Sequence, residues 1–127
     1  MLFRFGHFKM NPPLGNRKDQ EALIEGLIDG TIDAIATDHA PHTAEEKNRP
    51  IMNAPFGVTG LETSFCASYT ALVKSGLMTL PRLIERMSTR PAEILGLNRG
   101  KIEPGAAADL TFVDLNETFV LDRGEPQ

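Results

Sequence analysis

Residues 32–42 read Ile32-Asp33-Ala34-Ile35-Ala36-Thr37-Asp38-His39-Ala40-Pro41-His42, and this stretch determines how the rest of the chain is interpreted. Its residues 34–37 are short and uncharged, as in a parallel strand that is buried on both faces. Pro41 prevents a regular continuation because its ring fixes φ and it has no amide donor. The stretch therefore predicts a buried strand whose carboxyl end carries a carboxylate and two imidazoles, where α/β folds place their chemistry.

The composition indicates a globular domain. The chain has 127 residues, of which 41% are hydrophobic and 24% charged, enough to form a core. The net charge is −4 and no basic cluster occurs, which argues against a phosphate-backbone partner. No apolar run approaches the roughly 20 residues of a transmembrane helix, and residues 1–6 are too short for a signal peptide. With a single cysteine, Cys66, we expect a cytoplasmic protein that binds neither membranes nor nucleic acids.

The rest of the chain predicts a strand, a helix, a second strand, further helices and a small β segment. The first helix is indicated by apolar residues at three- and four-residue spacings, namely Ala22, Leu23, Leu27 and Ile24. The predicted strands cover residues 3–10, 34–37, 108–115 and 118–122, the last two as a hairpin. The predicted helices cover residues 17–28, 61–75, a segment capped by Thr79, and 90–97, with one helical turn at residues 43–47.

One buried strand cannot form a sheet or barrel alone, because both of its edges stay unpaired. The irregular segment over residues 43–60 is longer than most loops in compact domains, and such loops are often functional. The fold class is therefore α/β, and we expect the chain to be part of a larger architecture.

Three titratable residues, Asp38, His39 and His42, follow directly on the apolar strand. One interpretation is a metal or acid–base site, because a strand-end carboxylate can ligate a divalent metal and accept a proton from water. The other is a capping aspartate beside two surface histidines, and the spacing alone does not separate the two. A catalytic zinc takes about three protein ligands, and only His7 and Cys66 remain as further nitrogen or sulfur donors.

Asn11, Phe56 and Gly57 are candidate ligand contacts in loops. Asn11 precedes two prolines, so its amide could hydrogen-bond a polar ligand from a fixed position, although taken in isolation the residue fits a plain turn better. Phe56 and Gly57 could offer backbone groups, with Gly57 permitting close approach. The alternative for that pair is a turn with a buried ring.

The chain also contains a series of longer motifs in a fixed order. They are Lys9-Met10-Asn11-Pro12-Pro13-Leu14, Asp29-Gly30-Thr31-Ile32-Asp33, Ala36-Thr37-Asp38-His39-Ala40-Pro41-His42, Ala54-Pro55-Phe56-Gly57, Gly60-Leu61-Glu62-Thr63, Arg90-Pro91-Ala92-Glu93-Ile94-Leu95-Gly96-Leu97 and Gly105-Ala106-Ala107-Ala108-Asp109-Leu110. Over residues 8–122 these closely resemble the C-terminal third of bacterial dihydroorotase, of the longer zinc-dependent type in the amidohydrolase superfamily. Asn-Pro-Pro-Leu together with Asp-His-Ala-Pro-His is the pair most specific to dihydroorotase.

The resemblance implies an α/β fold: the C-terminal part of a metal-dependent (β/α)8 TIM barrel plus part of a small β-sandwich. Residues 1–97 would supply the last barrel strand or strands and flanking helices, with Asp38 at the catalytic face. Residues 98–127 would belong to the sandwich. A whole barrel takes roughly 250 residues, so this chain would hold only its last part.

The resemblance also implies an activity, the reversible conversion between dihydroorotate and N-carbamoyl-L-aspartate in pyrimidine biosynthesis. Asp38 would be a Zn²⁺ ligand and the general acid–base, taking a proton from zinc-activated water and passing it to the departing amide nitrogen. Asn11 and His42 would bind the substrate, with His42 near its carboxylate. Phe56 and Gly57 would contact the pyrimidine ring, largely through backbone groups.

Two departures from the family pattern bear on these expectations. Gly15 stands where an arginine commonly follows Asn-Pro-Pro-Leu. The other metal ligands and the main arginine for the substrate carboxylate lie upstream in the family, so we expect the chain to be inactive alone. The alternatives are another cyclic-amide hydrolase, allantoinase-like or dihydropyrimidinase-like, and a non-catalytic dihydroorotase-like assembly partner. Beyond a small-molecule substrate, the expected partners are a second copy of the chain or aspartate carbamoyltransferase.

Overall fold

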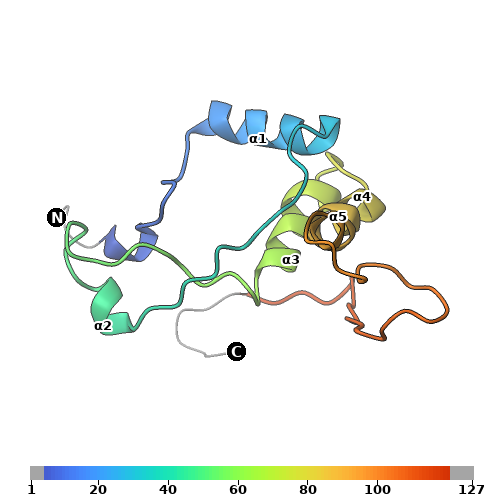
Figure 1. Ribbon diagram of the computed structural model, residues 1–127. Helices are drawn as coiled ribbons and strands as arrows, with labels where there is room; N and C mark the ends of the chain where they lie inside the picture. The colour runs from blue at the N-terminus through green and yellow to red at the C-terminus, as the bar shows by residue number, and fades with distance from the viewer. Residues whose placement is uncertain (1–4, 121–127) are drawn as a thin grey trace.

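The computed structural model describes residues 5–120. Within them the chain is helical in short pieces joined by long irregular segments (Figure 1). The helices are η1 (Phe5–Phe8), α1 (Arg17–Asp29), α2 (Ala44–Lys47), α3 (Ser64–Ser68), η2 (Tyr69–Lys74), α4 (Leu80–Ile84), η3 (Glu85–Thr89) and α5 (Arg90–Ile94). Of these, η1 is a 3₁₀ helix, and η2 and η3 are π-helical continuations of the α-helices before them.

Helix α1 confirms the helix predicted over residues 17–28. It begins with a capping box, in which the Asn16 side chain accepts from the backbone N–H groups of Lys18 and Asp19, and the Asp19 carboxylate accepts from the Asn16 N–H. It ends at Gly30, whose φ of 97° is the left-handed conformation that glycine adopts without strain.

The predicted apolar stripe of α1 is only half correct. Ile24 and Leu27 are partly buried against the helical core, as expected. Ala22 is exposed and Leu23 is 57% exposed, because within residues 5–120 nothing packs over that side of the helix.

The core lies among α3, η2, α4 and η3, with α1 packed against them. Leu83 is fully buried, and Leu72 and Met78 pack with it. Thr79 caps α4 as predicted, since its hydroxyl accepts from the Arg82 N–H. The predicted helix over 61–75 begins three residues later, at Ser64. Figure 1 shows these helices gathered on one side of the molecule, with α2 and η1 on the other.

The strand predictions are wrong for the part of the chain that the structure describes. Residues 34–37 are extended but form no β-ladder, and residues 5–8 form η1. Residues 108–120 contain no strand, and residues 121 and 122 of the predicted hairpin lie outside the described range. The β pairing seen is a single parallel bridge between His39 and Val58. A parallel strand pairs with segments distant in sequence, and residues 5–120 supply that pairing at one residue.

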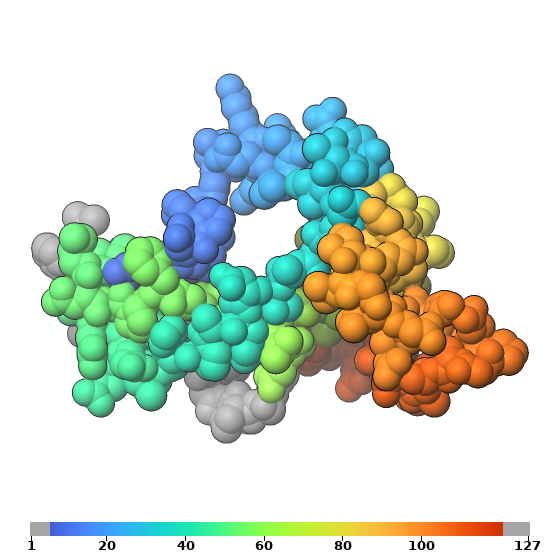
Figure 2. All heavy atoms as spheres, in the orientation of Figure 1, coloured from blue at the N-terminus to red at the C-terminus, as the bar shows by residue number. Residues whose placement is uncertain are grey.

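The molecule is open for its mass. A compact monomer of 13.9 kDa exposes about 6,700 Å², whereas this chain exposes 10130 Å². Figure 2 shows an opening through the described part, bounded by α1, by the residues before it and by the segment after it. No helix within residues 5–120 is long and apolar enough to cross a membrane.

Candidate active site

Asp38 has an unusual backbone conformation within residues 32–42. Its φ is 45°, the left-handed region, and it is the one non-glycine residue with positive φ in the described range. Aspartate tolerates this conformation better than most residues, and such positions concentrate at functional sites. The residue is exposed, and no hydrogen bond or ion pair engages its carboxylate within residues 5–120. The turn therefore presents a free carboxylate.

His39 connects this turn by hydrogen bonds to the loop that precedes α3. Its Nδ1 lies 3.1 Å from the Gly60 N and 3.3 Å from the Leu61 N, so it accepts from both N–H groups. A ring nitrogen that accepts carries no proton, which places the proton of the neutral ring on Nε2. The Ala40 N–H donates to the Val58 carbonyl beside it, at 3.0 Å. Among the described residues, His39 Nδ1 thus bonds the backbone of this loop.

His42 joins the same turn to Phe56. Its Nε2 lies 2.8 Å from the Phe56 carbonyl oxygen, and because a carbonyl only accepts, Nε2 carries the donated proton. The other ring nitrogen, Nδ1, lies 3.9 Å from the Glu46 carboxylate. The pKa of Glu46 is lowered, first by the hydrogen bond from the Thr43 backbone N–H, then by the Thr43 hydroxyl, with a smaller contribution from His42.

Gly57 allows these two segments to touch. Its φ is 115°, and a Cβ built on it would lie 2.5 Å from the Ala40 Cβ. Any larger residue would push the Asp38–His42 turn away from the Phe56–Gly57 turn. The Gly57 N–H also donates to the Lys9 carbonyl at 3.0 Å, which brings the N-terminal loop into the same cluster.

Asn11 follows Lys9 by two residues and is exposed. The Lys9 ammonium lies 4.4 Å from the centroid of the Phe56 ring, a cation–π contact. The structure therefore brings His42, Phe56 and Gly57 together through direct contacts, with Asp38 in the same turn as His42, and it ties the loop that carries Asn11 to them through Lys9.

Lys47 is a residue that sequence reasoning missed. It is 7% exposed, and its ammonium donates to the carbonyls of Lys9 (3.1 Å), Pro55 (3.2 Å) and Gly57 (2.8 Å). The predicted helical turn over residues 43–47 is confirmed as α2, with Thr43 as its cap. A lysine in such a turn is normally solvent-exposed, so nothing in the local sequence signalled its burial.

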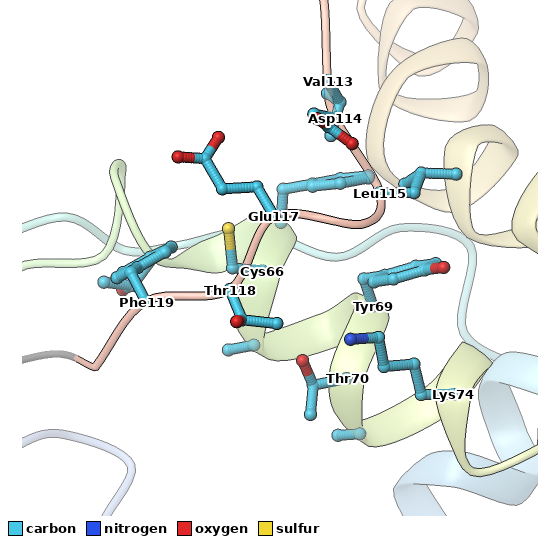
Figure 3. Close-up of a pocket in the computed structure, with 14 residues that line it drawn as sticks. Cys66, Tyr69, Thr70, Lys74, Val113, Asp114, Leu115, Glu117, Thr118 and Phe119 are labelled. Atoms are coloured by element: carbon cyan, nitrogen blue, oxygen red, sulfur yellow. The ribbon is translucent and has the colours of Figure 1, made fainter.

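A separate cavity lies elsewhere in the described residues. A hollow of about 420 Å³ lies between α3–η2 and residues 113–119, and none of Asp38, Asn11, His42, Phe56 or Gly57 lines it. Figure 3 shows Tyr69, Cys66 and Phe119 around it. Cys66 is partly buried and faces this cavity.

Comparison with known proteins identifies the family. The model of the Amidohydrolase family matches residues 11–126. The chain belongs to the amidohydrolase family. It is 59% identical over 116 residues to a dihydroorotase of Bacillus cytotoxicus and 56% identical over 117 residues to one of Bacillus pumilus. These matches cover 91% and 92% of this chain but 27% of each relative, so the chain spans about a quarter of their length.

A solved amidohydrolase-type structure shares the backbone. The L-hydantoinase (dihydropyrimidinase) of Arthrobacter aurescens superposes with a TM-score of 0.74 at 32% identity, over 82% of this chain and 24% of that one. The described residues therefore have part of a metal-dependent amidohydrolase fold.

The fit to a metal is partial. An exposed carboxylate without a partner among the described residues, such as that of Asp38, is chemically suited to one position around a divalent ion. Within residues 5–120, no group of three or more histidine, cysteine, aspartate or glutamate side chains is placed to hold one. The described residues thus offer one donor and not a complete set.

Proposed function

We propose that this chain supplies one part of a dihydroorotase active site. The observation that carries the proposal is the packing of the Asp38–His42 turn on the Phe56–Gly57 turn, through the 2.8 Å hydrogen bond from His42. It unites in space the motifs that resemble dihydroorotase, and the relatives at 56–59% identity have that name. The reaction is the reversible hydrolysis of dihydroorotate to N-carbamoyl-L-aspartate.

The proposed architecture is the end of a (β/α)8 barrel, residues 1–97, followed by part of a β-sandwich, residues 98–127. The unpaired extended segment before Asp38 supports this, because a barrel would give it strand neighbours on both sides. The surface of 10130 Å² supports it too, since the rest of a barrel would cover the exposed side of α1.

Asp38 is the proposed general acid–base. Its free carboxylate takes a proton from the water that attacks the ring carbonyl and returns it to the departing amide nitrogen. In ring closure it moves the proton in the reverse direction. A bound divalent ion, which we propose to be zinc with Asp38 as one ligand, would polarise the carbonyl and acidify water.

The substrate contacts are proposed for residues around this carboxylate. His42 would bind the substrate carboxylate, and its ring is held by the Phe56 carbonyl. Asn11 offers an exposed amide from the loop tied in by Lys9. Phe56 and Gly57 contact the ring through the backbone. We place the protein in the cytoplasm, with a second copy or aspartate carbamoyltransferase as its macromolecular partner.

The second candidate is hydrolysis of a hydantoin or a dihydropyrimidine. The backbone match to the L-hydantoinase favours it. These substrates lack the carboxylate that dihydroorotate carries on its ring, so the two candidates differ in one group.

A chimera separates the two candidates. The matching 116-residue segment of the Bacillus cytotoxicus dihydroorotase is replaced by this chain, and the purified protein is given zinc and assayed with dihydroorotate, dihydrouracil and hydantoin. We expect turnover of dihydroorotate alone, and no turnover by the isolated 127-residue chain. Turnover of hydantoin without turnover of dihydroorotate would overturn the proposal, and so would full activity of the isolated chain.

A further inference from the structure

The contacts of Lys47 carry an inference that deepens the proposed function and rests on it. The ammonium is almost entirely removed from solvent. Within the described residues no carboxylate pairs with it, and three backbone carbonyls solvate the charged group by accepting its hydrogen bonds. A lysine ammonium has three N–H donors, and here each one has an acceptor. The site is therefore fully satisfied, which is the condition for burying a charge without a counter-ion.

The three carbonyls come from two loops that are far apart in sequence. Lys9 belongs to the loop that leads to Asn11, and Pro55 and Gly57 flank Phe56. One ammonium thus joins both loops to α2, the helix that follows His42 in the chain. Gly6 adds to this packing, because a Cβ on it would lie 2.5 Å from the Lys47 carbonyl oxygen.

The consequence concerns which backbone groups the Phe56 turn leaves open. The carbonyls of Pro55 and Gly57 accept from Lys47, and the Phe56 carbonyl accepts from His42. The Gly57 N–H donates to Lys9, and proline has no N–H. Within the described residues, the one polar backbone group of residues 55–57 without a partner is the Phe56 N–H.

We infer that Lys47 is a positioning residue. Its ammonium holds the carbonyl oxygens of Pro55 and Gly57, so that the Phe56 N–H is the donor that this turn offers to an acceptor oxygen of the substrate. Lys47 itself touches no substrate. A substrate that presents a carbonyl or carboxylate oxygen to the Phe56 N–H is bound, and a substrate that presents an N–H to it is not.

The first test measures the turn in the isolated 127-residue chain, independently of activity. Amide hydrogen exchange is followed at Gly57, whose N–H donates to Lys9, and at Ile35, whose N–H donates to Arg86. Lys47→Met should speed exchange at Gly57 by about tenfold or more while Ile35 keeps its rate. The matched control is Lys74→Met, since Lys74 is exposed and its ammonium lies over the Tyr69 ring with no hydrogen bond or ion pair to a described residue. Unchanged exchange at Gly57, or an equal rise at both amides, would overturn the inference.

The second test uses the active chimera. Lys47→Met should raise the KM for dihydroorotate about tenfold or more and change kcat by less than about threefold, because the lost contact binds substrate and transition state alike. Lys47→Arg, which keeps the charge and its donors, should recover part of the loss. A fall in kcat with unchanged KM would contradict the positioning role. An inactive wild-type chimera would instead count against the proposed function, and the exchange measurement would then decide the inference alone.

Discussion

Arg86 provides a sharp test of what holds the Asp38 segment in place. Its side chain is 2% exposed, and its guanidinium donates to the Leu27 carbonyl from Nε and to the Asp33 carbonyl from Nη1, both at 3.2 Å. Its own carbonyl accepts from the Ile35 N–H at 3.0 Å. Arg86 therefore connects the end of α1, helix η3 and the start of the segment that leads to Asp38.

The substitution Arg86→Met removes both donors and keeps most of the aliphatic stem. Each carbonyl left without a partner in a buried place costs about 1–3 kcal/mol. Both bonds are only part-buried, so water reaches the vacated oxygens and we expect a loss near the lower bound, about 2–3 kcal/mol in total.

The matched control is Arg82→Met, one helical turn earlier. The Arg82 side chain is 36% exposed and pairs with Glu85 at 2.7 Å. Breaking an exposed pair of this kind costs less than about 1 kcal/mol. Urea unfolding followed by far-UV circular dichroism gives the free energies of unfolding of both variants. The reasoning is refuted if Arg86→Met is no more destabilising than Arg82→Met.

Two further predictions concern the candidate site. Gly57→Ala should lower the kcat/KM of the chimera by at least about tenfold, because the new Cβ would meet the Ala40 Cβ at 2.5 Å. The control is Gly105→Ala, also at positive φ but with nothing within 4 Å, which should leave kcat/KM within about twofold. Equal losses in the two variants would show that the contact between Gly57 and Ala40 is irrelevant. The folded-state pKa of Glu46 is lowered by the Thr43 hydrogen bonds, so its stabilisation of α2 is present above the unfolded pKa and is lost as pH falls through the folded value. The Thr43 amide chemical shift should report that acid transition and lose it in Glu46→Gln; a transition that persists in the variant would rule Glu46 out.

The helices could be predicted because their signals are local. Asn16 and Thr79 are capping residues within the turn that they cap, and Gly30 ends α1 by its own conformation. The strand predictions are wrong for the described residues, because a strand is defined by partners elsewhere in the chain. Residues 34–37 have the composition of a buried strand, yet within residues 5–120 only the bridge from His39 to Val58 supplies a neighbour.

The candidate site shows the same difference between features set by local sequence and features set by the packing of distant segments. The tip carrying Asp38 and His42 could be proposed as a candidate site from its residues, because titratable groups directly follow an apolar run there. Its backbone φ of 45° and the contact from His42 to Phe56 could not, since both depend on how distant segments pack. Lys47 was missed for the same reason. Its role comes from carbonyls at residues 9, 55 and 57 and not from its neighbours in α2.

The central claim is that Asp38 transfers the proton in dihydroorotate hydrolysis. The most direct test measures dihydroorotate turnover by the chimera and compares Asp38→Asn with Asp33→Asn. Asp33 lies on the same segment, where it pairs with Arg90 at 2.7 Å and has a lowered pKa through that hydrogen bond. The account predicts that Asp38→Asn loses at least about a hundredfold in kcat, while Asp33→Asn stays within about twofold of wild type because its pair is half-exposed. Equal turnover by Asp38→Asn and wild type would contradict the account.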